Sequence, residues 1–132
     1  MMQSAALLYQ LTGNGQYLKD AQAIAAAWHN YFFMEFTTGQ GEPFRMLKKG
    51  DVWFTAVMLR GFIELYQVDG NKVYLDSFAR SLDYAWTHAR EDNGLFNTDF
   101  TGKSCDNRKW LLTQAAMVEM YARLAVFANQ SL

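Results

Sequence analysis

Two polar, glycine-containing segments of this 132-residue chain, 34–51 and 91–107, carry or adjoin aromatic side chains together with carboxylate, amide and guanidinium groups. A sugar ring presents an apolar face and a rim of hydroxyls. A site that binds one therefore needs aromatic platforms beside carboxylate, amide or guanidinium groups, because a buried hydroxyl without a partner is costly. The two segments contain that combination. They predict a saccharide-binding surface made of Phe44, Arg45, Asp51, Trp53, Phe96, Asn97, Asp99, Phe100, Asp106 and Arg108.

The other candidate groups for chemistry have structural interpretations. Glu91 and Asp92 are the only adjacent pair of acidic residues, and they stand where a helix should end, so the helix dipole gives their carboxylates no support. His29 and His88 have no Cys or His partner at metal-ligand spacing, and Cys105 has no base beside it to make it a nucleophile. The residues themselves predict no catalytic group, no metal site and no cofactor in this chain.

Arg60 stands inside an otherwise apolar stretch, between Leu59 and Gly61. A guanidinium in such surroundings needs a carboxylate or several carbonyls. We therefore expect Arg60 to form a structural pair, with direct ligand contact as the alternative. Glycine within a helix costs about 1 kcal/mol relative to alanine, so Gly61 indicates a close approach of two helices.

The elements that must position these residues are repeated along the chain. Residues 8–18 read LYQLTGNGQYL and residues 65–75 read LYQVDGNKVYL, with seven of eleven positions identical at an offset of 57. Each copy contains the end of an apolar run, a tight Gly-Asn turn and the start of a second apolar run. This pattern predicts one helix, a short turn and an antiparallel partner helix.

Apolar periodicity over the rest of the chain predicts further helices, and Asp51 is suited to cap one of them at its N-terminus. Segments 44–47 and 94–100 are compatible with short extended pieces, and no strand pair is expected elsewhere. We expect a single all-α domain over residues 1–132, with helices at about 2–12, 16–33, 52–68, 72–90 and 108–129.

The lengths of the connections predict where the candidate site lies. The turns within the two hairpins are very short, whereas the connections between hairpins, 34–51 and 91–107, are long. Because the helices alternate in direction, both long connections should lie at one end of the bundle and both tight turns at the other. Functional residues concentrate on long loops held by a rigid scaffold, so we expect the end with the long connections to be the working face.

Composition excludes some classes of partner. Lys and Arg number 12 and Asp and Glu number 13, which gives a formal charge of −1 and no basic stripe for nucleic acid. No apolar run approaches the 18 residues typical of a membrane span. Apolar residues make up 51% of the chain, enough to build a packed core. These values favour a globular, helix-rich domain.

Three segments resemble six-hairpin (α/α)-barrel glycosidases, and in particular glycoside hydrolase family 76, the α-1,6-mannanases. Residues 8–25, LYQLTGNGQYLKDAQAIA, resemble the hairpin signature of these barrels. The family's F-K-G-I-F-x-R segment resembles residues 54–60, FTAVMLR, with Thr55 for the lysine, Ala56 for the glycine and Arg60 matching. The helix after the family's T-Y-N-x-G motif resembles the opening MMQSAALLYQLTG. The resemblance covers nearly the whole chain and implies antiparallel helical hairpins forming the C-terminal part of an (α/α)6 toroid.

The resemblance also implies a division between binding and catalysis. The family is similar to retaining glycosidases that use two adjacent aspartates, one as nucleophile and one as general acid. No two aspartates are adjacent in this sequence, and the family's pair lies upstream of the segment aligned with Met1. The resemblance therefore implies a portion of an α-1,6-mannan hydrolase that is inactive alone, with an α-mannan oligo- or polysaccharide as partner. It also implies an extracytoplasmic location, although the start of this chain shows no targeting segment.

Two other functions remain open. The chain could be a non-catalytic helical module that binds carbohydrate or protein, or part of another α/α-toroid sugar enzyme such as an epimerase or a glucuronyl hydrolase. Part of a toroid also exposes the faces on which further hairpins would pack, and large apolar patches drive association. We therefore expect self-association through the open barrel face.

Overall fold

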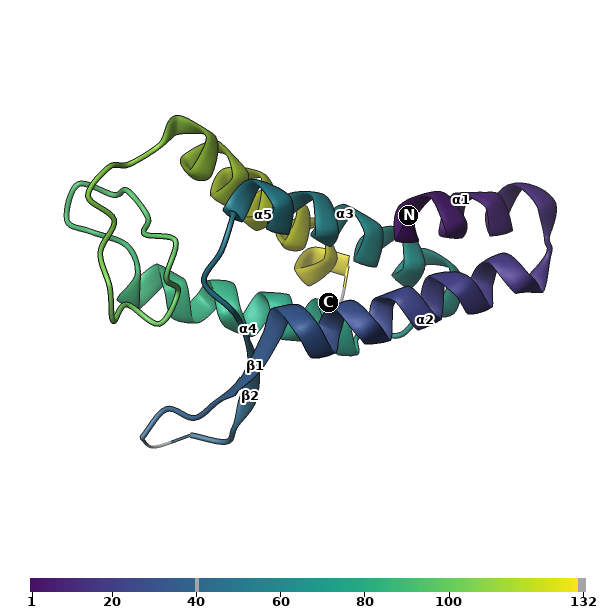
Figure 1. Ribbon diagram of the computed structural model, residues 1–132, viewed down its shortest axis with the longest axis horizontal. Coiled ribbons are helices and arrows are strands. Elements are labelled where there is room, and N and C mark those ends of the chain that lie inside the picture. The colour runs from purple at the N-terminus through teal and green to yellow at the C-terminus, as the bar shows by residue number, and fades with distance from the viewer. Residues whose placement is uncertain (40, 131–132) are drawn as a thin grey trace.

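The computed structural model describes residues 1–39 and 41–130. Within these ranges the chain is a series of antiparallel helices with one short β-hairpin that projects from them (Figure 1). No helix in the described ranges has the length and hydrophobicity needed to cross a bilayer. The elements in chain order are α1 (Met2–Thr12), α2 (Gly15–Phe32), β1 (Phe33–Phe36), β2 (Phe44–Leu47), α3 (Val52–Asp69), α4 (Val73–His88) and α5 (Leu111–Gln130).

Helix α3 is the centre of the molecule, because it packs against both α1 and α5. Gly61 is the point of close approach to α1: a Cβ added there would lie 2.8 Å from the Cε of Met2. Arg60, the next residue along, forms a bidentate pair with Glu119 of α5, with its Nε 3.1 Å from Oε2. Both expectations for this stretch are therefore met. Helices α2 and α4 lie below these three in Figure 1.

The two tight turns have the same geometry, as the sequence repeat predicts. Gly13 and Gly70 both end a helix in the left-handed conformation with φ of 69°, which glycine adopts without steric cost. Each donates its main-chain N–H to a tyrosine carbonyl four residues back at 2.8 Å. The Asn14 and Asn71 side chains then accept from the backbone of the second residue after them, at 3.0 and 3.1 Å. The repeat is a structural unit as well as a sequence one.

The all-α expectation needs one correction, because the connection 33–51 contains a β-hairpin. Helix α2 ends at Phe32, and the next residues form β1, which pairs antiparallel with β2 from Phe33 opposite Leu47 to Phe36 opposite Phe44. Strand β2 packs on α4 and buries Met46 and Leu47. The segment forms paired strands and not the expected loop, because Phe33, Met46 and Leu47 extend the hydrophobic core. The extended piece expected at 44–47 is confirmed, whereas 94–100 takes part in a single bridge, between Arg90 and Phe96.

An aromatic chain links the hairpin to the helical core. Phe33 of β1 packs edge-on against Phe78 at 5.1 Å between ring centroids, and Phe78 packs against Phe62 at 5.5 Å. His29 lies against Phe33 at 4.8 Å, and its Nε2 is 2.9 Å from the Ser77 hydroxyl. Burial, and after it the charge of Arg45, lower the pKa of His29. His29 is thus a packing residue.

The turn geometry makes a prediction that one matched pair of substitutions tests. Replacing Gly13 by alanine should lower the free energy of unfolding by about 1 to 2 kcal/mol, because a Cβ is strained at positive φ, although nothing lies within 4 Å of it. Gly15, two residues on, is equally open but has no positive φ. Its replacement by alanine should leave stability unchanged or raise it by about 0.5 kcal/mol. Urea unfolding of both variants measures the difference, and equal losses would contradict it.

Candidate functional site

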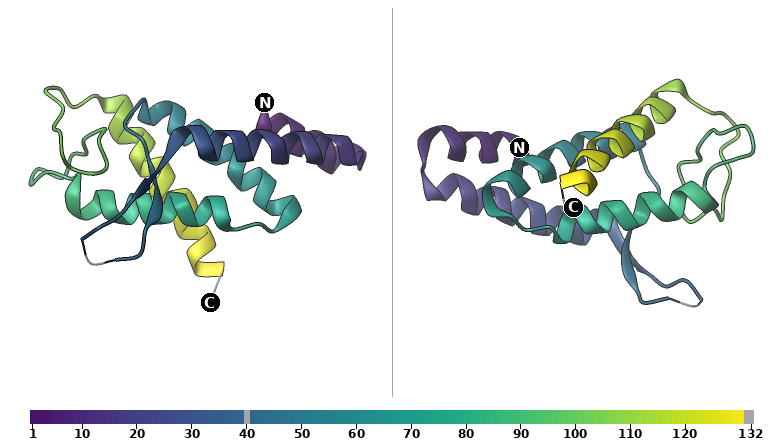
Figure 2. Two further views of the ribbon diagram at one scale, coloured as in Figure 1. Left: turned by 60° about the horizontal axis from the view of Figure 1, so that its bottom comes forward. Right: turned by 180° about the vertical axis from the view of Figure 1, so that it is seen from behind.

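The two long connections lie at the same end of the molecule, and the tight turns lie toward the other end (Figures 1 and 2). Connection 33–51 leads from α2 to α3, and connection 89–110 leads from α4 to α5. The Nζ of Lys49 lies 3.2 Å from the Ser104 hydroxyl and ties one connection to the other. Both long connections therefore lie at one end of the molecule, as their lengths predicted.

Connection 89–110 is organised around the buried side chain of Asn97, which is 3% exposed. The amide group of Asn97 donates to the Ala89 carbonyl and to Glu91, both at 3.3 Å. Its Oδ1 accepts from the backbone N–H of Asp106 at 2.8 Å and from Lys109 Nζ at 2.7 Å. One side chain thus joins the beginning and the end of the loop, and every polar atom of its amide is satisfied.

Lys109 completes this network. Its Nζ contacts Glu91 at 2.8 Å and the Asp106 carbonyl at 2.8 Å, in addition to Asn97. The hydrogen bond from Lys109 holds the pKa of the Glu91 carboxyl below its usual value. Because Lys109 is anchored in this way, α5 begins at Leu111 and not at Arg108 as the periodicity suggested.

Two other acidic side chains hold the rest of the loop. Asp99 accepts four hydrogen bonds, from the backbone and hydroxyls of Thr101 and Ser104, at 2.6 to 3.1 Å. Partial burial raises the pKa of the Asp99 carboxyl and these bonds lower it, with a net shift downward. Asp106 accepts from the backbone and the hydroxyl of Thr98 at 2.7 and 2.8 Å. Both carboxylates therefore act within the loop.

Several other predicted site residues are also engaged internally. Arg45 donates to the carbonyls of His29, Asn30 and Phe33 at 3.0 to 3.3 Å and so satisfies the end of α2. Phe44 lies under the guanidinium of Arg80, 5.0 Å from it. Two more of the predicted site residues, Phe96 and Phe100, are buried in the core.

Three of the predicted residues remain open to solvent: Asp51, Trp53 and Arg108. Trp53, in the first turn of α3, is 49% exposed, and Trp110, just before α5, is 67% exposed. The sequence argument did not select Trp110, although it follows Trp53 at the same offset of 57 residues that relates the two repeated segments. The repeat was therefore a signal that could have found it.

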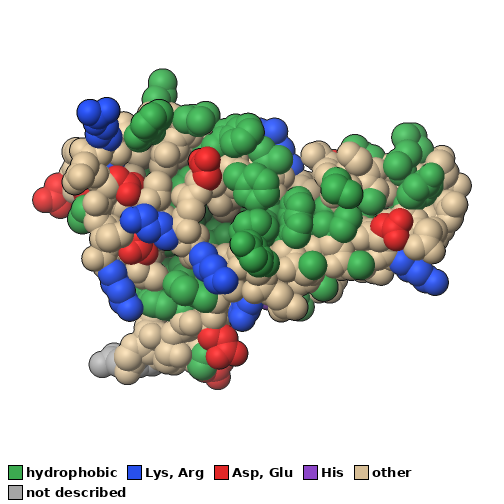
Figure 3. Space-filling view, in the orientation of Figure 1, with side chains coloured by type: hydrophobic (Ala, Val, Ile, Leu, Met, Phe, Trp, Pro, Cys, Tyr) green, Lys and Arg blue, Asp and Glu red, His purple; other side chains and the backbone are tan. Residues whose placement is uncertain are grey.

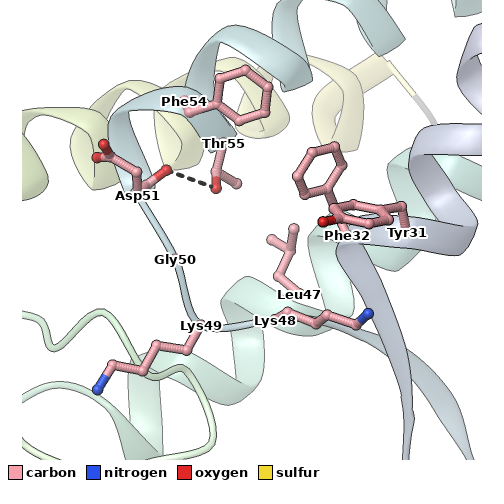
Figure 4. Close-up of a pocket in the computed structure, with 9 residues that line it drawn as sticks. All are labelled: Tyr31, Phe32, Leu47, Lys48, Lys49, Gly50, Asp51, Phe54 and Thr55. Atoms are coloured by element: carbon pink, nitrogen blue, oxygen red, sulfur yellow. Dashed lines mark hydrogen bonds between the residues drawn. The ribbon is translucent and has the colours of Figure 1, made fainter.

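A cavity of about 330 Å³ opens between the end of α2 and the start of α3. Phe32 and Phe54, with ring centroids 5.4 Å apart, line its upper part, and Leu47 lies below them (Figure 4). The Thr55 hydroxyl donates to the Asp51 carbonyl at 3.2 Å, and the Asp51 carboxylate points away from the cavity. The walls are apolar with a polar rim, the combination that suits a sugar ring.

Cations and a tyrosine border the same cavity. Lys48 and Lys49 run along its lower edge (Figure 4), and the Nζ of Lys48 lies 5.5 Å from the centre of the Tyr31 ring. Tyr31 is 69% exposed. None of these three residues was selected from the sequence, because that argument did not count lysine ammonium groups and placed Tyr31 within the predicted helix 16–33.

A second cavity, of about 530 Å³, lies at the start of α5. Arg108, Trp110 and Gln114 line it, and so does Lys49, which the two cavities share. Gln114 is fixed by paired hydrogen bonds to the backbone N–H and carbonyl of Phe96 at 2.8 and 2.9 Å. Among the described residues, no three His, Cys, Asp or Glu side chains are grouped to hold a metal ion.

Two solved structures are similar to this chain over nearly its whole length. One is a family 76 glycoside hydrolase from a bovine strain of Bacteroides thetaiotaomicron, with a TM-score of 0.92 and 38% identity, matched over 96% of this chain and 28% of that one. The other is a family 76 glycoside hydrolase, a mannosidase, from Bacteroides thetaiotaomicron VPI-5482, with a TM-score of 0.92 and 37% identity. It is matched over 99% of this chain and 36% of its own. No family model and no curated protein matches the chain.

The similarity fits the geometry described above. The match extends through both long connections as well as the helices, because it covers 96% or more of this chain. It spans 28% and 36% of the two relatives' own length, so each relative contains a large region with no counterpart here. The chain therefore resembles, from end to end, one part of a family 76 glycoside hydrolase.

Proposed function

We propose that this chain is a carbohydrate-binding C-terminal portion of a glycoside hydrolase acting on α-1,6-mannan, in which its hairpins form part of an (α/α)6 toroid. The observation that carries the proposal is its similarity, at 37% identity over 99% of the chain, to a family 76 mannosidase. The cavities at the end with the long connections support it, because they combine aromatic walls with amide, hydroxyl and cationic groups.

Binding at this end uses exposed aromatic platforms. Trp53 and Trp110 each stand at the start of a helix, at 49% and 67% exposure, and a pyranose packs its apolar face on such rings. Arg108 lies beside Trp110 in the second cavity and supplies donors to sugar hydroxyls. The residues proposed to contact sugar are therefore fewer than those predicted from the sequence, and they include Trp110, which the sequence analysis did not select.

We assign cleavage of the glycosidic bond to residues outside this chain. Retaining hydrolysis needs two carboxyl groups about 5 to 5.5 Å apart, one ionised and one protonated. Glu91 and Asp92 are the only adjacent acids in the sequence, and the Glu91 carboxylate is held within the loop by Lys109 at 2.8 Å and by Asn97 at 3.3 Å. The hydrogen bond from Lys109 lowers the pKa of Glu91, so that its carboxyl is ionised at neutral pH and has no proton to donate. We propose that the chain alone binds mannan without hydrolysing it.

A helical protein-interaction module is the second candidate function. The observation that favours it is the large apolar surface that α5 leaves uncovered, including Leu111 at 83% and Val118 at 68% exposure. Such patches mark contact surfaces between proteins. The two functions are compatible, because that surface and the cavities use different residues.

Calorimetric titration tests the binding proposal. An unbranched α-1,6-linked mannooligosaccharide should bind saturably, and Trp110→Ala and Trp53→Ala should each weaken binding by at least about fivefold, or about 1 kcal/mol, because each removes a stacking platform. Val73→Ala provides the control, since Val73 is 57% exposed but stands beside a tight turn at the start of α4.

Equal binding by the unsubstituted chain and its three variants would contradict a binding site at Trp53 and Trp110. Absence of binding by the unsubstituted chain would contradict the proposed carbohydrate-binding function. Reducing ends released from the same oligosaccharide by the purified chain would contradict the assignment of cleavage to residues outside it.

Lys109 is expected to position Trp110, its neighbour in sequence. Lys109→Met removes the cation that joins Glu91, Asn97 and the Asp106 carbonyl. The free energy of unfolding should fall by about 1 to 3 kcal/mol, because the buried side chain of Asn97 loses a charged partner, and mannooligosaccharide affinity should fall with it. Urea unfolding and calorimetry measure the two effects.

Lys103→Met is the matched control, because Lys103 is an exposed lysine of the same loop whose ammonium lies 6.0 Å from the Phe36 ring centre. A Lys109→Met protein with the stability and affinity of this control would show that the network does not order the loop.

A further inference from the structure

His29 stands in the last turn of α2, where this helix meets β1 and α4. Its ring contacts Phe33 of β1 and Tyr74 of α4, with ring centroids 4.8 and 5.0 Å apart. The Ser77 hydroxyl donates its one hydrogen to the Val73 carbonyl at 3.2 Å, so its oxygen accepts from Nε2–H of His29 at 2.9 Å. The neutral imidazole therefore bonds α2 to α4 while it packs on β1.

The same side of α4 holds strand β2. Ser81, one turn after Ser77, is fully buried, and its hydroxyl accepts from the Leu47 N–H at 3.1 Å and donates to the Ser77 carbonyl at 2.8 Å. The N–H of Lys48 donates to the Phe32 carbonyl at 2.9 Å. Phe32, Leu47 and Lys48 line the cavity between α2 and α3 (Figure 4). The walls of this cavity therefore depend on how β2 is held against α4 and the end of α2.

The surroundings of His29 already carry a positive charge. The guanidinium of Arg45 donates to the His29 carbonyl at 3.1 Å, and its buried Nε has no partner among the described residues. Glu35 stands opposite Arg45 in the ladder but forms no ion pair with it in the described part of the chain. Figure 3 shows Lys and Arg side chains where the hairpin leaves the helices and acidic side chains on the hairpin itself. A proton on His29 adds a second cation beside Arg45, with no carboxylate paired to either.

The aromatic neighbours of His29 do not offset such a charge. Strand β1 presents the apolar ring of Phe33. Burial, and after it the charge of Asp69, raise the pKa of Tyr74, so its phenol is neutral in mildly acidic solution. Burial and then Arg45 lower the pKa of His29, whereas an unfolded chain has the ordinary histidine pKa of about 6.5. The stability that neutral His29 contributes is therefore complete above about pH 6.5 and is lost as the pH falls toward its lowered pKa.

We propose that His29 is a positioning residue of the cavity between α2 and α3: its neutral ring holds strand β2 in place, and its protonation loosens β2 and weakens saccharide binding. The cavity walls that respond are Leu47 and Lys48, because both are carried by the end of β2. The binding part of this proposal rests on the proposed carbohydrate function, whereas the structural part needs no ligand.

The backbone amide signals of Leu47 and Lys48 test the structural part by nuclear magnetic resonance of the unsubstituted chain. Between about pH 7.5 and about pH 5.5, where an imidazole changes charge, both signals should move with one midpoint. That midpoint should lie below about pH 6.5 and coincide with the titration of the His29 ring in the same samples. Protection of the two amides from hydrogen exchange, corrected for the intrinsic rate, should fall at least about threefold over this range.

A matched pair of histidine variants identifies the responsible group. His29→Gln keeps a donor for Ser77 but cannot be protonated, so it should abolish the response of both amides. His88→Gln is the control, because His88 is the other histidine of the sequence and is exposed, and it should respond like the unsubstituted chain. A response that persists in His29→Gln overturns the proposal. So do amides of the unsubstituted chain that titrate at a different midpoint from the His29 ring, a criterion that does not depend on the folding of a variant.

Calorimetric titration with the same α-1,6-linked mannooligosaccharide tests the binding part. The unsubstituted chain should bind at least about threefold more weakly at about pH 5.5 than at about pH 7.5, and His29→Gln should bind equally at both. Equal affinity of the unsubstituted chain at the two pH values overturns the proposal. The pH-dependent amide response in a chain that binds no saccharide would support the role of His29 in holding β2 and contradict the proposed carbohydrate function.

Discussion

The position of α3 between α1 and α5 is the constraint on which the rest of the molecule depends. Gly61 admits the Met2 side chain into a space that a Cβ would take, and the adjacent Arg60 pairs with Glu119 on α5. A half-exposed ion pair contributes little stability by itself, but here it fixes the orientation of α5 relative to α3. With these helices aligned, Trp53 and Trp110 are brought to the same end of the molecule, where connections 33–51 and 89–110 meet.

The connection before α5 shows how a long loop reaches a defined conformation through hydrogen bonds and an ion pair between its own side chains and backbone. Its buried polar groups satisfy one another, and Asn97 and Lys109 join its two ends. A network of this kind is stable only when every member has a partner. The aromatic and cationic groups that face solvent, Trp110 and Arg108, are thereby held at the edge of a cavity. The network of Asn97 and Lys109 therefore both orders the loop and leaves Trp110 and Arg108 facing solvent.

The sequence predicted what is local and missed what depends on distant partners. Both tight turns were predicted because Gly13 and its repeat need only their own backbone conformation. The strand at 33–36 was missed because its stability comes from pairing with β2, which packs on α4. The position of both long connections at one end of the molecule was predicted from their lengths, but two of the residue types expected to meet a sugar, asparagine and aspartate, are also those that satisfy loop backbone. Sequence alone does not show that the side chains of Asn97 and Asp99 form hydrogen bonds within the loop. Trp110 could have been predicted, because it lies at the repeat offset of 57 residues from Trp53.

The most direct test of the account uses the four tryptophans as reporters. Their indole N–H resonances can be followed by nuclear magnetic resonance while an α-1,6-linked mannooligosaccharide is added. The account predicts that the signals of Trp53 and Trp110 move together and saturate at one dissociation constant. It predicts that Trp86, which lies on α4 under the guanidinium of Arg90, moves least. Movement of Trp86 with Trp53 and Trp110 unchanged, or no movement at any tryptophan, would contradict a carbohydrate site at the end with the long connections.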